Sequence, residues 1–320
     1  MEIELKRYKN NPILMPTPHK WENKAVFNCG ATIHNGRVAL LYRAQGDDMI
    51  SRFGLAFSDD GYHIAERLPD PVFDADHDTE YETLGVEDPR ISIIGDSYYI
   101  VYTSASLYPS VAGKGVEQRE AGEVPWRVRV SIAHTNDFRT FTRHGVVISH
   151  IDSKDGVLFP GKFRNQMLLL HRVIPDVRLA IGEHVTGFVE RGPLLGASGK
   201  GWDAIRVGAG APPIKTAHGW VLIYHGVDGK GHYSIGLALI DPHDPLHVIA
   251  RSKKPILSPK EDYEKSGQVD NVVFSCGAVR VKDELLVYYG AADSTIAVAS
   301  IEYSKIEQWA EYHYRHAHKK

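Results

Sequence analysis

The chain has 320 residues, of which 43% are hydrophobic and 24% charged, and its formal net charge is −3. These values are ordinary for a globular protein, and the balanced charge gives no support for nucleic-acid binding. No stretch reaches the ~18 apolar residues of a membrane span, and residues 1–6 lack the form of a signal peptide. Because Cys29 and Cys276 form neither a disulfide framework nor a metal motif, we expect free thiols, no metal and a cytoplasmic protein.

A repeated segment organises the chain. Residues 26–31, VFNCGA, return as residues 273–278, VFSCGA, and a tyrosine follows thirteen residues after each cysteine. The same spacing, counted from Pro89, Leu158 and Ala211, leads to a tyrosine or histidine in three further segments. The five marker residues are Tyr42, Tyr102, His171, Tyr224 and Tyr289. Each unit has the pattern of a strand, a polar turn and a second strand.

The spacing of these markers predicts the fold. They lie 53 to 69 residues apart, which leaves room for a second hairpin in each unit. Five units of about four strands predict an all-β fold, a five-bladed β-propeller, in which residues 1–320 form a single domain. A β-helix is the alternative, but the repeat is too long for one of its coils. A β-sandwich would give no reason for the fivefold recurrence.

Two segments depart from the repeat. Residues 113–125 are polar and contain glycine, which indicates a surface loop or lid, although a solvated insertion without function explains them equally well. Residues 305–316 predict a short C-terminal helix with Ile306, Trp309 and Ala310 on one face. That face could dock on the propeller or on another subunit, so a homo-oligomer stays open.

Asp88 is the first candidate catalytic residue. It lies in the segment Gly85–Arg90, directly before an apolar strand pattern at residues 91–94. Because Pro89 restricts the residue before it, we expect an extended backbone at Asp88. A carboxylate held rigidly at a strand entrance is a candidate general acid. The simpler interpretation is a strand-edge turn in which a carboxylate pairs with Arg90.

Further polar residues stand at comparable strand ends of the other units. The entrances of the inner strands carry or follow Asn28, Asp88, Lys154 and Arg206. The second strands are followed by Arg43, Arg172, His225 and Asp293. A propeller directs such positions to one mouth of its channel. Inverting hydrolysis needs two carboxyl groups, whereas one framed carboxylate facing several cations fits inorganic phosphate as the nucleophile.

These residues carry a resemblance to a known family. The motifs are Val26-Phe27-Asn28, Glu87-Asp88-Pro89-Arg90, His171-Arg172, Tyr224-His225-Gly226 and the segment Tyr288–Asp293. In order and spacing they resemble those of glycoside hydrolase family 130 over roughly residues 7–303. The resemblance implies a five-bladed propeller that cleaves β-linked mannosides by inverting phosphorolysis and forms α-mannose 1-phosphate. It implies no cofactor, with inorganic phosphate as the co-substrate.

The resemblance also implies roles for individual residues. Asp88 would be the general acid and would act through a hydroxyl group of the bound mannose. The phosphate-binding residues would be Lys154, Arg172, Arg206 and His225. The sugar-binding residues would be Asn28, Arg43 and Asp293.

Two other functions stay open at this point. An inverting β-mannosidase would need a general base, for which Asp155, Asp176 and Asp203 are available. A non-catalytic glycan-binding propeller would leave the clustered cations unexplained. The sequence also leaves open β-1,4 against β-1,2 linkage and the identity of the acceptor sugar.

Overall fold

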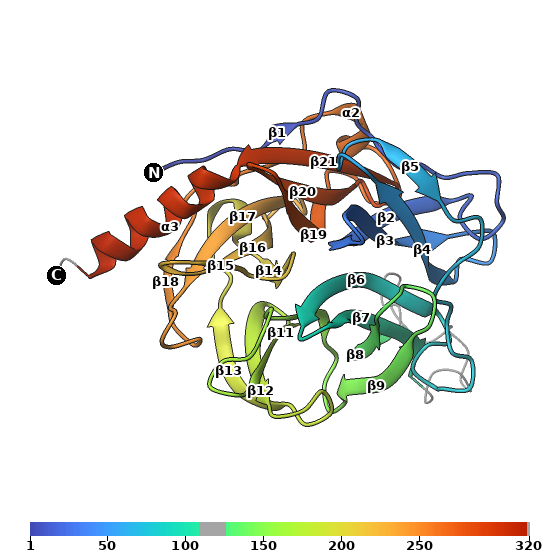
Figure 1. Ribbon diagram of the computed structural model, residues 1–320, viewed down its shortest axis with the longest axis horizontal. Helices are drawn as coiled ribbons and strands as arrows, with labels where there is room; N and C mark the ends of the chain where they lie inside the picture. The colour runs from blue at the N-terminus through green and yellow to red at the C-terminus, as the bar shows by residue number, and fades with distance from the viewer. Residues whose placement is uncertain (109–125, 319–320) are drawn as a thin grey trace.

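The computed structural model describes residues 1–108 and 126–318, in which four β-sheets form five antiparallel blades around a central axis (Figure 1). One sheet contains the first two blades, which are joined by a single parallel pair between Ser51 and Gly85. The predicted all-β, five-bladed propeller with a C-terminal helix is thereby confirmed. The loop predicted over residues 113–125 lies outside the described residues. Among the described helices, none is long and apolar enough to cross a membrane.

Each blade is built mainly from consecutive strands, the innermost given first. The first blade contains β2 (Ala25–His34), β3 (Arg37–Gln45), β4 (Ser51–Ser58) and β5 (Ile64–Arg67). The second contains β6 (Gly85–Ile94), β7 (Ser97–Leu107), β8 (Trp126–Thr135) and β9 (Thr142–Ile148). The third contains β10 (Lys154–Leu158), β11 (Met167–Val173), β12 (Asp176–Gly182) and β13 (Val189–Leu195).

The fourth and fifth blades vary this plan. The fourth contains β14 (Arg206–Ala209), β15 (Ile214–Thr216), β16 (Gly219–Val227), β17 (Tyr233–Ile240) and β18 (Val248–Arg251). The fifth contains β19 (Val273–Val281), β20 (Glu284–Ala291), β21 (Thr295–Glu302) and β1 (Lys6–Arg7). Two short helices precede inner strands, η2 (Gly201–Asp203) and α2 (Asp262–Lys265), and α3 (Tyr303–Ala317) follows the last strand.

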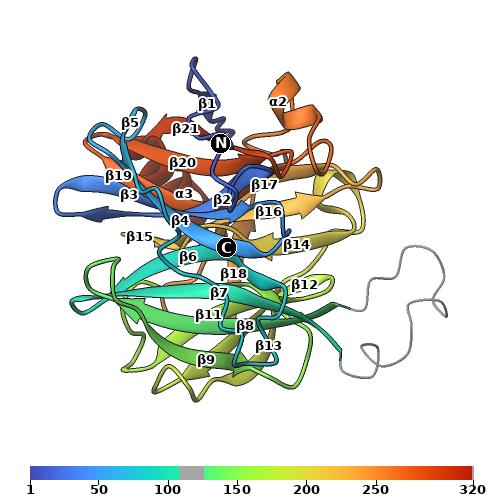
Figure 2. The same ribbon diagram turned by 90° about the vertical axis from the view of Figure 1, so that its right-hand side faces the viewer.

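The fifth blade joins the two ends of the chain. Strand β1 is its outermost strand and lies antiparallel to β21, with Lys6 opposite Ser300 and Arg7 opposite Ala299 (Figure 2). The ring is therefore closed by main-chain hydrogen bonds between residues almost 300 positions apart.

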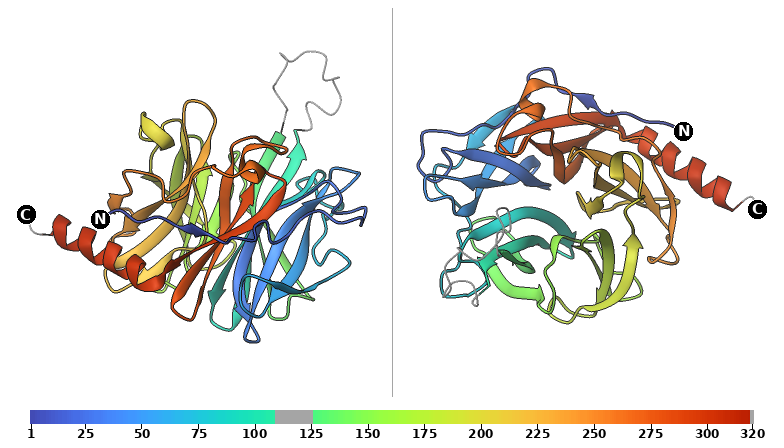
Figure 3. Two further views of the ribbon diagram at one scale, coloured as in Figure 1. Left: turned by 90° about the horizontal axis from the view of Figure 1, so that it is seen from above. Right: turned by 180° about the vertical axis from the view of Figure 1, so that it is seen from behind.

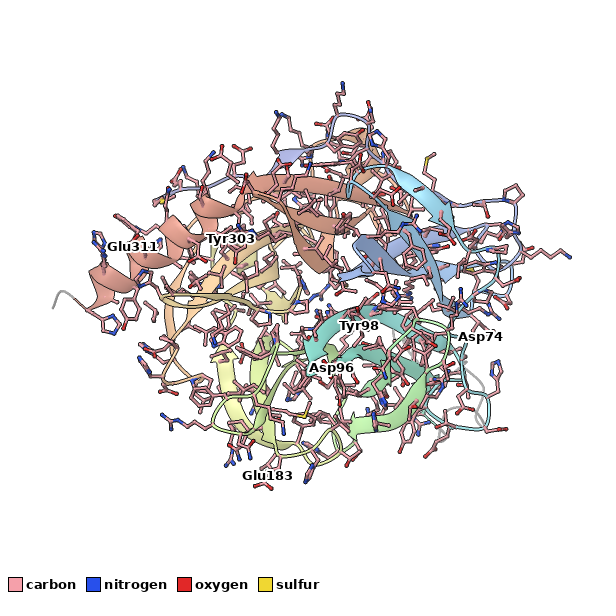
Figure 4. All side chains as sticks on the ribbon, in the orientation of Figure 1. Asp74, Asp96, Tyr98, Glu183, Tyr303 and Glu311 are labelled. Carbon is pink, nitrogen blue, oxygen red and sulfur yellow. The ribbon has the colours of Figure 1, made fainter. Side chains whose placement is uncertain are left out.

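Helix α3 docks on its own propeller. It begins at Tyr303, two residues before the predicted start, and Ile306, Trp309 and Ala310 are fully buried on its inner face. They belong to the core cluster that lies between the fourth and fifth blades, and the N-terminal segment runs beside the helix (Figure 3). Tyr303 packs against Arg280, whose Cζ lies 4.2 Å from the ring centroid, whereas Glu311 lies on the outer side (Figure 4).

The marker tyrosines owe their recurrence to a repeated buried contact, here called the blade clamp. In four blades the tyrosine hydroxyl donates a hydrogen bond to a carboxylate just before or near the inner strand, and that carboxylate also binds an arginine from the outermost strand. The clamps are Tyr42–Glu22–Arg67, Tyr102–Glu82–Arg143, Tyr224–Asp203–Arg251 and Tyr289–Glu264–Arg7. Each clamp thus ties the entry loop, a middle strand and the outer strand of one blade together.

The third blade replaces the tyrosine by a histidine. His171 is fully buried, a hydrogen bond of 2.8 Å joins its Nδ1 to the Ser153 hydroxyl, and its Nε2 lies 3.8 Å from Glu190. The thirteen-residue register was wrong here. The spacing led from Leu158 to His171, but Leu158 pairs with Leu169, because residues 159–166 form a longer connection than the two-residue turn at 35–36.

Candidate functional site

The site begins with a bulge in each of the first three inner strands. Asn28, Asp88 and Asp155 have φ angles of 47°, 54° and 53°, and the pairing with the neighbouring strand shifts register at each of them. The extended backbone expected at Asp88 is therefore wrong. Pro89 disfavours the right-handed helical region, but Asp88 takes the left-handed one because it forms part of a bulge. Non-glycine residues adopt this strained region rarely and often at functional sites.

The bulge at Asp88 turns two neighbouring carboxylates toward one arginine. In a regular strand, successive side chains point to opposite faces. Here Arg43 reaches both, since its Nη2 donates to Glu87 at 2.7 Å and its Nη1 to Asp88 at 3.1 Å. Asn28 also donates to Asp88, at 2.9 Å. Asn28, Arg43 and Asp88, which the sequence predicted for one site, are thus in direct contact.

Asp88 is ionised in this environment. Burial opposes the charge, but the positive charges of Arg43, Lys154 and Arg90 and the hydrogen bond from Asn28 hold its pKa below the usual value. The paired carboxylate is therefore a poor acid by itself, and a change in the nearby charges is needed before it holds a proton.

Arg90 plays a different part from the simple ion pair considered above. It is fully buried and donates to the main-chain carbonyl of Asp88 at 2.8 Å, not to its carboxylate. Further donations go to the carbonyls of Ala209 and Gly210, at 3.1 Å and 3.2 Å. Its Nη2 lies 3.3 Å from Asp155. Arg90 therefore links the second, third and fourth blades beneath the site.

The predicted phosphate residues lie next to this carboxylate group. Lys154 Nζ lies 3.4 Å from Glu87. Arg172 Nη1 lies 2.8 Å from Asp155 and 3.3 Å from His225 Nε2. Arg172 of the third blade and His225 of the fourth are thus in direct contact.

Arg206 stands slightly apart and is connected through an aromatic ring. It donates to the hydroxyl of Tyr233, and its Cζ lies 5.2 Å from the centre of that ring. The Tyr233 ring in turn lies 5.9 Å from the ring of His225. Within the described residues, Arg172 Nε, Arg206 Nε and His225 Nδ1 are buried without a hydrogen-bond partner. Buried polar atoms are nearly always paired, so this cluster is suited to an anionic ligand.

Asp293 is the remaining residue that the sequence predicts for sugar binding. It lies in the turn between β20 and β21 with a φ of 49°. Burial and the negative charge of Asp88 raise the pKa of Asp293 to about 6. The buried Oδ1 of Asn28 has no partner among the described residues, and Gly290 provides its space, since a Cβ there would lie 2.0 Å from it. These groups can accept hydrogen bonds from sugar hydroxyls.

Other parts of the described chain do not compete for this role. A cavity of about 630 Å³ lies between residues 1–4, residues 251–256 and helix α3, away from all predicted site residues. Residues 1–108 and 126–318 contain no group of three or more His, Cys, Asp or Glu placed to hold a metal ion. Cys29 and Cys276 are free and buried, which confirms the prediction, and burial raises the pKa of both thiols.

Sequence reasoning missed several members of the cluster. Glu87 stood beside Asp88 but received no role, because successive residues of a strand normally point to opposite faces. Asp155 was considered only as a base for hydrolysis, since the wrong register of the third unit hid its equivalence to Asp88. Arg90 was considered only as the ion-pair partner of a carboxylate in a strand-edge turn, and Tyr233 received no role.

A propeller in which the carboxylates of Glu87, Asp88 and Asp155 lie beside Lys154, Arg172 and His225 fits an enzyme that acts with an anionic reactant. A family model described as beta-1,4-mannooligosaccharide phosphorylase, that of glycoside hydrolase family 130, matches residues 4–119 and 121–312. The chain belongs to this family of enzymes.

Individual relatives agree with this membership. The chain is 39% identical over 313 residues to a 1,2-beta-oligomannan phosphorylase of Thermoanaerobacter sp. (strain X514), which covers 95% of this chain and 99% of the relative. It is 36% identical to a beta-1,2-mannobiose phosphorylase of the same organism, with the same coverage. The solved structure of beta-1,2-mannobiose phosphorylase from Listeria innocua, in complex with beta-1,2-mannobiose, has a TM-score of 0.83. It is 29% identical and is matched over 97% of this chain and 100% of that one.

Proposed function

We propose that the protein cleaves β-1,2-linked mannosides by inverting phosphorolysis and releases α-mannose 1-phosphate. The observation that carries phosphorolysis is the convergence of Lys154, Arg172 and His225 at the mouth where Asp88 lies. The β-1,2 linkage is supported by the names of two relatives that are 39% and 36% identical to this chain over 95% of its length.

The roles of the residues follow from their chemistry. The Arg172 guanidinium presents several N–H donors to phosphate oxygens, and Lys154 adds a point charge. A phosphate oxygen attacks the anomeric carbon from the face opposite the glycosidic bond, and the C–O bond to the acceptor sugar breaks. Asp88 supplies the proton to the leaving oxygen through a hydroxyl of the mannose. The reaction is balanced in protons, because hydrogen phosphate loses one proton and the released acceptor sugar gains one.

Phosphate binding would also prepare the acid. The cations that keep Asp88 ionised include Lys154, which we place among the phosphate ligands. A bound phosphate dianion offsets their positive charge and raises the pKa of Asp88. Asp88 then becomes competent as an acid only when the nucleophile is present.

Hydrolysis has less support from the same residues. Asp155 is fully buried beside Arg90 and Arg172, and Asp203 is held in the blade clamp of Tyr224. Asp176 accepts a hydrogen bond from the main chain of residue 197. None of these three carboxylates is placed as a free base beside Asp88.

One experiment tests both parts of the proposal. Purified enzyme is incubated with β-1,2-mannobiose or β-1,4-mannobiose, with and without inorganic phosphate. We expect α-mannose 1-phosphate from the β-1,2 substrate only when phosphate is present. Free mannose as the sole product in the absence of phosphate would indicate the hydrolase, and preferred cleavage of the β-1,4 substrate would overturn the linkage.

A further inference from the structure

Asp155 is a buried carboxylate between the predicted phosphate ligands and the floor of the site. Its side chain has no exposed surface. One oxygen lies 3.3 Å from Arg90, and the other lies 2.8 Å from Arg172 and 3.4 Å from His225. Asp155 therefore contacts Arg172 and His225, two of the proposed phosphate ligands. It also contacts Arg90, which binds the main chain of Asp88.

The space for this carboxylate depends on a glycine in the next blade. A Cβ atom at Gly208 would lie 2.3 Å from Asp155 Oδ2 and 2.4 Å from His225 Nε2. Both distances are far below a van der Waals contact, and both atoms belong to packed, buried groups. Strand β14 thus leaves a gap at Gly208 into which Asp155 and His225 fit together.

The contacts of Asp155 determine which donors remain for a ligand. Arg172 Nη1 lies 2.8 Å from Asp155 Oδ2 and 3.3 Å from His225 Nε2, while Arg172 Nε is buried without a hydrogen-bond partner among the described residues. Because the guanidinium is planar and rigid, fixing Nη1 also fixes the direction of its other donors. A carboxylate near Nε2 likewise orients the His225 ring and its unpaired Nδ1.

We propose that Asp155, seated against Gly208, is a positioning residue that holds Arg172 and His225 in the orientation that binds phosphate. The inference rests on the proposed phosphorolysis. It assigns Asp155 no proton transfer and no contact with the reacting atoms.

Charge and position predict opposite effects of losing this carboxylate. As a negative charge beside the anion site, Asp155 repels phosphate, so its neutralisation alone would lower the KM for phosphate. As a positioning group it keeps Arg172 and His225 aligned, so its loss would raise that KM. The sign of the change therefore separates the two roles.

The first test is Asp155→Asn in the full-length enzyme, with the KM for phosphate and for mannoside measured separately. A misplaced charge-assisted contact weakens binding by roughly ten- to a hundredfold, so we expect the phosphate KM to rise about tenfold or more. The mannoside KM should change by less than about twofold, because the predicted sugar-binding residues, Asn28, Arg43 and Asp293, do not contact Asp155.

Glu264→Gln is the matched control for the loss of a buried carboxylate. Glu264 is also fully buried and pairs with an arginine, Arg7, but it belongs to the blade clamp of the fifth blade. This variant should lose stability while both KM values stay within about twofold of the wild type. A merely structural role of Asp155 would give the same pattern in Asp155→Asn.

The second test keeps every charge and changes only position. Gly208→Ala inserts the Cβ atom that displaces Asp155 and His225, and we expect the phosphate KM to rise about tenfold. Gly229→Ala, in the β16–β17 turn where an added Cβ meets nothing within 4 Å, should leave it unchanged. If Asp155→Asn does not fold, the comparison of Gly208→Ala with Gly229→Ala still tests the positioning role.

The possible outcomes separate this inference from the function on which it rests. If the wild-type enzyme turns over equally well without phosphate, the proposed function fails. If the wild type requires phosphate but folded Asp155→Asn and Gly208→Ala keep or lower the phosphate KM, only the positioning role is overturned.

Discussion

Arg43 Nη1 lies 3.1 Å from Asp88 Oδ1, so the proposed general acid is a paired carboxylate before any ligand arrives. Burial opposes its charge, yet Arg43, Lys154 and Arg90 together keep the pKa of Asp88 below its usual value. An anion that binds to Lys154 weakens this effect. Anion binding and protonation of Asp88 are therefore linked.

This linkage predicts proton uptake when a dianion binds. Sulfate is the suitable probe because, unlike phosphate, it does not titrate near neutral pH. Calorimetry at about pH 5.5 in two buffers of different ionisation enthalpy should show more protons taken up by the wild type than by Asp88→Asn. His225 can contribute in both proteins, since burial lowers its pKa and an anion would raise it. Equal uptake by the two proteins would contradict the linkage.

Asp88→Asn should lose turnover more than binding. The amide keeps the size of the side chain but cannot supply the proton that the leaving sugar needs. General acid catalysis contributes roughly 10²- to 10⁴-fold, so we expect kcat to fall by that order. Steady-state kinetics should show a phosphate KM within about threefold of the wild type. A kcat near the wild-type value would remove Asp88 from the mechanism.

Arg172→Ala should show the opposite pattern. It removes a charge-assisted contact worth roughly 1.5–3 kcal/mol, so the phosphate KM should rise by roughly one to two orders of magnitude. Turnover at saturating phosphate should stay above that of Asp88→Asn. Arg164→Ala, at an exposed arginine of the same blade, is the control and should behave as the wild type. Unchanged phosphate dependence in Arg172→Ala would argue against phosphate binding by this residue.

His171 makes stability depend on pH. Burial lowers the pKa of His171 to about 4, from an ordinary value near 6.5. Between these values the unfolded chain binds a proton that the folded protein refuses, so stability is full above pH 6.5 and falls toward pH 4. The loss amounts to about 3 kcal/mol. Urea unfolding at pH 7 and pH 4.5 should show that the free energy of unfolding changes less with pH in His171→Gln than in the wild type. His63→Gln, at an exposed histidine, should show the same change as the wild type.

Arg7→Ala should open the fifth blade. It leaves Glu264 buried without its partner, and breaking a buried pair in this way costs about 3–5 kcal/mol. Lys254→Ala removes an exposed pair with Glu2 and should cost less than about 1 kcal/mol. Thermal unfolding of the two variants gives the comparison. Similar melting temperatures would mean that the blade clamp contributes little.

The fold could be predicted from the sequence because the marker tyrosines make the same buried contact in four of the five blades. Tyr42 and its counterparts recur since each must reach a buried carboxylate, and this requirement keeps the spacing regular. The carboxylates themselves could not be predicted, because their arginine partners come from outer strands at variable distances along the chain. The pairing Tyr42–Glu22–Arg67, for example, requires knowledge of which strands share a blade.

The site was predictable where single residues follow the repeat, as for Arg43 and Asp88. It was not predictable where geometry departs from a regular strand. The left-handed conformation of Asp88 brings Glu87 into the site, and the long connection of the third blade conceals Asp155. Both features depend on pairing with a neighbouring strand, which local sequence does not reveal.

The closure of the ring by β1 has a consequence for how the chain is made. Lys6 and Arg7 leave the ribosome almost 300 residues before their partners in β21. During that time β1 has no neighbouring strand with which to pair. Four blades can assemble before strands β19–β21 of the fifth blade have been synthesised. Whatever holds or shields the nascent N-terminal segment in that interval governs the yield of closed rings, so changes at Lys6 or Arg7 should affect biosynthesis before they affect catalysis.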